Sequence, residues 1–152
     1  MPLDHETARC TLARWQQTLR LSDWDITLRL MPLSWRKSGD IKIDADDRKA
    51  VLMLNRRPRC ENIDELVAHE LLHLKLWGLD QMIEELIDAL YGGQARDSKR
   101  SFAYTQFMKT LESTVEDLTK GFLTAAGCSA PLSQGRLRRQ ASVGERARKR
   151  LA

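Results

Sequence analysis

Two histidines and a glutamate form the part of this sequence whose spacing best suits a chemical site. His69 and His73 lie four residues apart in the stretch HELLH. On a helix, side chains at this spacing lie about 5–6 Å apart on one face, so both imidazoles can bind one zinc ion. Glu70 lies about 100° further round the helix, where it can act as a general base toward a zinc-activated water. The stretch therefore predicts a zinc site with hydrolytic chemistry.

A third protein ligand is expected just beyond the histidines, because catalytic zinc typically has three ligands and one open position. The candidates are Asp80, Glu84 and Glu85, with Asp88 near them. If Gly78 reverses the chain, the next helix runs back along the histidine helix toward the metal. Glu84 and Asp88 then share a face, so one can bind zinc while the other accepts the free ring N–H of a ligating histidine. Glu85 points about 100° away, and Asp80 is better explained as a helix N-cap.

The elements that must position these groups can be predicted from hydrophobic periodicity. Apolar residues at helical spacing, such as Leu12, Trp15 and Leu19, predict a helix over 4–21. Alternating residues predict a strand over 24–30 and another around Ile41 and Ile43, and an apolar run predicts a third over 49–55. Further helices are expected over 63–77, 81–91 and 99–125.

Signals at the ends of these helices support the prediction. Asn62, followed three residues later by Glu65, is typical of an N-cap with a reciprocal acidic partner. Gly78 is expected to end the histidine helix. The last helix should bury one stripe, made of Phe107, Leu111, Val115, Leu118 and Phe122. Short connections between the strands predict an antiparallel sheet, so the expected fold is α+β.

Composition predicts one domain followed by a basic tail. The chain has 152 residues, of which 42% are hydrophobic, and a formal charge of +4. Residues 134–152 carry seven Arg and Lys against one Glu, a net +6, so the rest of the chain is at −2. We expect a domain over 1–127 and a disordered tail over 128–152 that has a non-specific attraction to nucleic acid.

The same features suggest a soluble protein of the cytoplasm. Cys10, Cys60 and Cys128 are odd in number and lack the spacing of a zinc ribbon or redox pair, which favours a reducing compartment. The first ten residues contain acids and no apolar core of a signal peptide. No apolar run approaches the roughly 20 residues that a membrane span needs.

The motif and its surroundings resemble a known group of enzymes. HELLH, followed by Glu84 and Asp88 at Glu-x-x-x-Asp spacing, is similar to the gluzincin branch of the zincin metallopeptidases. Residues 24–93 resemble small phage and prophage metallopeptidases, proteins of the ImmA/IrrE type and, more loosely, SprT-like proteases. The resemblance implies that His69, His73 and Glu84 bind Zn²⁺ and that Glu70 is the general base. It also implies that Asp88 supports a ligating histidine.

The resemblance also carries expectations about the substrate. The strand over 50–55 is expected at the sheet edge beside the metal helix, where it would pair with an extended peptide. The interval from His73 to Glu84 is shorter than in thermolysin-like enzymes, so Glu85 and Asp80 stay open as ligands. Tyr91 is the nearest residue for stabilising an oxyanion. Two alternatives to a peptidase remain: a non-catalytic zinc-binding accessory protein of a phage or mobile element, and a DNA-associated protease recruited by the basic tail.

Overall fold

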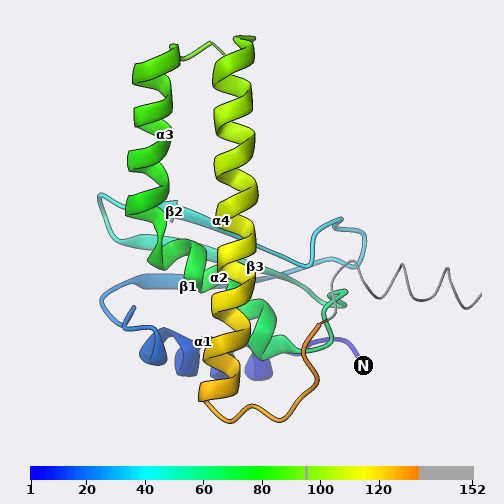
Figure 1. Cartoon of the computed structure of the whole chain (residues 1–152). Coiled ribbons are helices and arrows are strands. Elements are labelled where there is room, and N and C mark those ends of the chain that lie inside the picture. Colours follow the sequence, from blue (N-terminus) through cyan, green and yellow to red (C-terminus); the bar gives the residue numbers. More distant parts are fainter. Residues whose placement is uncertain (95, 134–152) are drawn as a thin grey trace, which may run out of the picture.

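The computed structural model describes residues 1–94 and 96–133, and within these the chain has the predicted α+β class. The described elements are four helices and one mixed three-stranded sheet (Figure 1). Their bounds are α1 (His5–Thr18), β1 (Asp25–Met31), β2 (Gly39–Asp44), β3 (Lys49–Asn55), α2 (Ile63–Lys75), α3 (Trp77–Tyr91) and α4 (Ser98–Ala125). All seven predicted elements are therefore confirmed, with shifts of a few residues at their ends.

The sheet is not wholly antiparallel, so that prediction was wrong. Its strand order is β1-β3-β2, and β3 pairs parallel with β1 and antiparallel with β2. The prediction assumed that a short link joins neighbouring strands. Here the link 32–38 passes over the end of β3, so β1 and β2 lie on opposite sides of it. The apolar run of β3 fits this central place, because a strand with two neighbours is the most buried of a sheet.

One buried side chain holds the crossing link in place. The Asn55 amide, at the end of β3, donates hydrogen bonds to the carbonyl oxygens of Trp35 at 2.8 Å and Lys37 at 3.2 Å. Its own carbonyl oxygen accepts from the Arg57 N–H at 2.8 Å, and its backbone N–H donates to the Ser38 carbonyl. Asn55 thus gives hydrogen-bond partners to two backbone carbonyls of the link.

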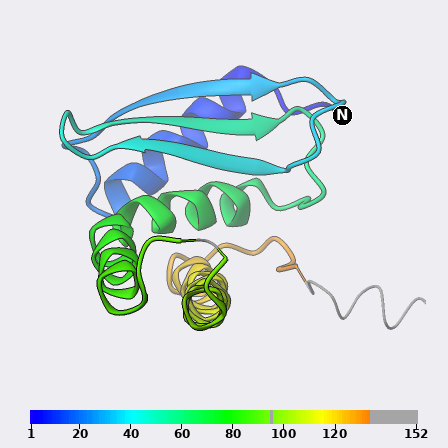
Figure 2. The same cartoon turned by 90° about the horizontal axis from the view of Figure 1, so that it is seen from above.

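The helices form two further layers on the sheet. α1 packs against β1, α2 against β2, and these two helices contact each other. α2 lies between the sheet and α4, as Figure 2 shows from above. The core between them is apolar and includes Trp15, Leu52, Val67, Leu71 and Val115, all at most 1% exposed. α2 is therefore covered on several sides, and one remaining strip of it carries the polar groups of HELLH.

The junction of α2 and α3 differs from the prediction. Gly78 does not end α2, since the helix ends at Lys75 and α3 begins at Trp77, with Leu76 as the cap of both. Asp80 lies in the first turn of α3 and makes no N-cap hydrogen bond. A single non-helical residue deflects the chain but does not reverse it. α3 therefore runs across the direction of α2 and not back along it (Figures 1 and 2).

α3 and α4 form an antiparallel hairpin that projects beyond the sheet (Figure 1). Asp97 caps α4, and the Arg100 guanidinium, near the start of α4, is 2.7 Å from the Asp88 carboxylate in α3. The buried stripe of α4 differs from the predicted one. Leu111 and Val115 belong to it as expected, but it continues through Thr119 and Leu123.

The predicted stripe mixed spacings of three and four residues, whereas the buried stripe keeps a strict spacing of four. The hydroxyl of Thr119 fits that apolar environment because it donates to the Val115 carbonyl at 2.7 Å. Leu118 and Phe122, predicted to be buried, are each 38% exposed.

The end of the described chain returns to the start of α2. The Ser133 backbone N–H donates to a Glu65 carboxylate oxygen at 2.8 Å, and the Ser133 hydroxyl contacts the other oxygen. Asn62 donates to the Pro131 carbonyl at 3.4 Å. Most of the predicted tail, residues 134–152, lies outside the described residues. Among the described helices, none is both long and apolar enough for a membrane span.

Candidate metal centre

α2 presents the motif residues because its other faces are buried. Asn62 caps the helix, and its side chain accepts from the Glu65 N–H at 3.1 Å, as predicted. The predicted reciprocal bond is absent among the described residues, because the Glu65 carboxylate binds Ser133 instead. With the apolar side chains of the helix in the core, His69 and His73 lie together on the remaining strip. Their side chains are 20% and 21% exposed.

The third group beside the histidines is Glu112 of α4. Its Oε1 lies 2.9 Å from His69 Nε2, its Oε2 lies 3.2 Å from His73 Nε2, and the two Nε2 atoms are 3.3 Å apart. Among the described residues, these three make up the set whose ligand atoms all lie within 4.8 Å of one another. Glu112 was not among the third ligands predicted from the sequence.

The donor set fits zinc. Ligand atoms about 2.0–2.1 Å from a tetrahedral ion lie about 3.3 Å from one another. The two Nε2 atoms have that spacing, and each is close to one of the two Glu112 oxygens. Two imidazole nitrogens and one carboxylate are donors that zinc accepts in hydrolytic enzymes. Three protein ligands would leave a fourth position open.

The structure does not bring Glu84 to the histidines. Glu84 lies on the second turn of α3, where Gln81 donates to it at 3.4 Å. Asp88, predicted to support a histidine, binds Arg100 instead. Glu85 is exposed, and Tyr91, the residue considered for an oxyanion, is exposed at the far end of α3. These positions follow from the direction of α3, since the prediction depended on its running back along α2.

Asp80 lies nearest to the site of the predicted carboxylates. It lines the same cleft as the two histidines but is outside the set of converging ligand atoms. Burial raises the pKa of its carboxyl, and the charge of His73 opposes that shift. Asp80 therefore adds a carboxyl group to the wall of the site, and burial disfavours the charged form of that group.

A signal for Glu112 was present in the sequence. It directly follows Leu111, a member of the predicted apolar stripe of α4, so it had to lie at the border of the buried face. A side chain at such a border can reach a neighbouring element, and Glu112 does so although it is 50% exposed. Which element it faces depends on how α4 crosses α2, and that crossing was not predictable from local patterns.

Burial and neighbouring charges shift the pKa values of His69, Glu112 and Glu70. Burial by itself would lower the pKa of His69, but the hydrogen bond with Glu112 and its negative charge outweigh burial and raise it. The hydrogen bonds with His69 and His73 hold the pKa of the Glu112 carboxyl far below its ordinary value. Burial raises the pKa of Glu70, against the opposing charges of both histidines. Glu112 is thus held in its charged form by the two histidines, and Glu70 is a stronger base than an exposed glutamate.

Glu70 and the three converging side chains line one cleft of about 280 Å³. The other lining residues are Asp40, Ile41 and Ile43 of β2 and Trp77 and Asp80 of α3. Glu70 is 8% exposed, so it is almost enclosed beside the histidines. The strand that borders the cleft is β2, at the sheet edge. The prediction that residues 50–55 form this edge was wrong, because β3 is the central strand.

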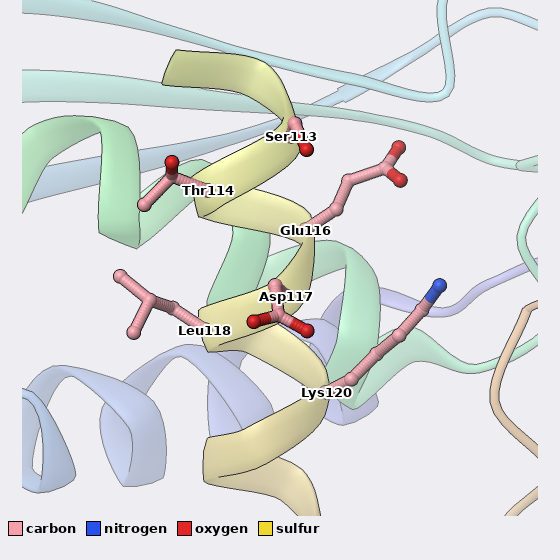
Figure 3. Close-up of a pocket in the computed structure, with 6 residues that line it drawn as sticks. All are labelled: Ser113, Thr114, Glu116, Asp117, Leu118 and Lys120. Carbon is pink, nitrogen blue, oxygen red and sulfur yellow. The ribbon is translucent and has the colours of Figure 1, made fainter. Parts of the chain in front are cut away.

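A second hollow follows α4 and has a different character. Its labelled residues, from Ser113 to Lys120, all belong to that one helix, and their side chains spread to both sides of it (Figure 3). None is a histidine or cysteine, and within residues 1–94 and 96–133 no second element lines this hollow. The chemistry-bearing groups gather in the cleft beside α2.

Comparison of the chain with protein-family models, with curated proteins and with solved structures finds no match. The candidate metal centre is therefore supported by its own residues and geometry.

Proposed function

We propose that this protein is a zinc-dependent peptidase that hydrolyses peptide bonds, with a zincin-like arrangement of its site. The observation that carries the proposal is the convergence of His69, His73 and Glu112 beside the buried carboxylate of Glu70. A purely structural zinc site needs four protein ligands and no general base. Three ligands with a neighbouring base suit hydrolysis better.

His69, His73 and Glu112 would hold the ion. Zinc bound there would polarise the scissile carbonyl and lower the pKa of a water at its open position. Both Nε2 atoms face the Glu112 carboxylate, so these two nitrogens, once deprotonated, would be the histidine atoms that bind the ion.

Glu70 would move the protons of the reaction. Its carboxylate would accept a proton from the attacking water as the new C–O bond forms. It would then donate that proton to the amide nitrogen, so that the C–N bond breaks and the amine leaves. A pKa above that of an exposed glutamate suits both steps, since a very weak base would accept the proton poorly.

An extended peptide would bind along β2. This strand borders the cleft, and among the described strands it pairs with β3 alone. Its other edge would therefore offer backbone N–H and C=O groups to a further strand. Pairing by backbone hydrogen bonds would lay a peptide across the histidines with little dependence on side-chain sequence. The proposed substrate is accordingly an unfolded or flexible segment of a protein.

Hydrolysis of an unstructured protein such as casein by zinc-loaded wild type and Glu70→Gln tests the function. We expect the wild type to release peptides, chelation to stop it, and Glu70→Gln to lose roughly 100-fold or more in rate. Glu85→Gln, an exposed acid of α3, is the matched control and should keep the wild-type rate. Zinc-loaded wild type that releases no peptide from casein or from a mixed peptide library would contradict the proposal.

A further inference from the structure

Gly39, at the start of β2, lies unusually close to the proposed base. A Cβ built on Gly39 would be 3.1 Å from Glu70 Oε1 and 3.2 Å from Glu70 Cγ. It would also be 2.9 Å from Cδ1 of Leu66, which is 7% exposed in the core. Real side chains rarely approach so closely, so any residue larger than glycine would have to displace its neighbours.

The backbone does not explain the glycine. The described glycines with positive φ are Gly92 and Gly127, so Gly39 has a conformation that other residues also adopt. Gly39 also lies in a strand, where glycine costs stability and gives no side chain to pack. The glycine is explained by its surroundings, because α2 leaves no room for a side chain at this position.

Of the two neighbours, the Glu70 side chain can be displaced more easily than Leu66. Leu66 is packed in the core, whereas the Glu70 carboxylate lines an open cleft into which it can be pushed. We propose that Gly39 is a positioning residue, whose missing side chain leaves the space that holds the Glu70 carboxylate beside the histidines. This inference rests on the proposed function for its catalytic meaning, but the contact itself can be tested without any activity.

The contact is tested by thermal unfolding of the metal-free protein in four forms: wild type, Gly39→Ala, Glu70→Ala and the double variant. We expect Gly39→Ala to lower the melting temperature by a few degrees, and to lower it clearly less when Glu70→Ala has removed the crowded side chain. An equal drop in both backgrounds would overturn the inference. If Gly39→Ala does not fold, Leu66→Ala is added to all four forms, because it removes the shorter contact.

The catalytic consequence is tested with zinc and casein. Gly39→Ala should keep about one zinc per chain, since it touches no proposed ligand, while kcat/KM falls roughly 10- to 100-fold through the displaced base. In a Glu70→Gln background the same substitution should cost little more, because the base is already lost. Gly121→Ala, whose added Cβ meets nothing within 4 Å, should keep the wild-type rate.

The outcomes separate the two proposals. Gly39→Ala with the wild-type rate would overturn the positioning role, even if the wild type is a peptidase. A wild type without hydrolysis would contradict the proposed function, and the melting temperatures would still decide whether Gly39 makes room for Glu70.

Discussion

At the scale of single residues, the central assignment is Glu112 as the third ligand in place of Glu84. We expect Glu112→Gln to weaken zinc binding by more than about 100-fold, since even a partner outside the metal's own ligands contributes 10- to 100-fold. Glu84→Gln should bind zinc like the wild type, because Glu84 contacts Gln81 and not the histidines. Titration with a competing chelator measures both. If Glu84→Gln weakens zinc binding and Glu112→Gln does not, the third ligand is Glu84, as expected from the sequence.

The ion pair of Glu112 with His69 predicts how the metal-free protein responds to pH. A raised pKa on His69 stabilises the fold below its ordinary value of 6.5 and ceases to do so as the pH rises through the folded-state pKa. A lowered pKa on Glu112 stabilises the fold above its ordinary value of 4.5. Both contributions are present together between about pH 4.5 and 6.5.

The wild type should therefore exceed Glu112→Gln in melting temperature most strongly near pH 5.5, and less at pH 8.5. Thermal unfolding in the presence of a chelator measures the difference. A difference that grows from pH 5.5 to pH 8.5 would contradict the pairing. Added zinc should invert the trend, because protons compete with the metal for the same atoms.

At the scale of elements, Asn55 holds the link that lets β1 and β2 flank β3. Asn55→Ala should lower the free energy of unfolding by roughly 2–3 kcal/mol, because it leaves the carbonyls of Trp35 and Lys37 without their donor. Urea unfolding measures the loss. Ser34→Ala, in the same link but exposed, should stay within about 0.5 kcal/mol of the wild type. Equal stability of the two variants would show that the link does not depend on Asn55.

The elements themselves could be predicted from sequence, but not all of their neighbours. Caps such as Asn62 and the alternation of β1 act over a few residues, so they can be seen in the chain. The strand order could not, because seven residues suffice either to turn back beside β1 or to cross over β3. Local signals do not distinguish these two paths.

The same distinction separates the residues that the motif brings together from the residue that it does not reveal. His69, Glu70 and His73 come together through one turn of helix, so their spacing alone places them in one cleft. Glu112 joins them only because α3 runs across α2 and α4 then returns past it. One non-helical residue, Leu76, sets that direction. The residue types around Leu76 do not predict the angle between the two helices.

At the scale of the whole molecule, charge is divided between a near-neutral body and the basic residues 134–152. We expect the full chain to bind a short DNA duplex weakly, and the affinity to fall steeply between about 50 and 200 mM salt. Deletion of residues 134–152 should abolish this binding and leave the melting temperature unchanged, because the described contacts to α2 end at Ser133. Fluorescence anisotropy measures the binding.

A full-length variant in which the seven basic residues of this segment are replaced by glutamine is the matched control, and it should behave like the deletion. Binding that survives both changes would place the nucleic-acid contact on the body.

The separation of the three converging side chains along the chain has a thermodynamic consequence. His69 and His73 lie on α2 and Glu112 on α4, so an ion held by all three would close a loop of roughly forty residues that includes the whole of α3. Such an ion would act as a removable cross-link, similar in its entropic effect to a disulfide over the same span. The projecting hairpin could then open only by releasing the ion, and its opening would become rarer as the concentration of free metal rises.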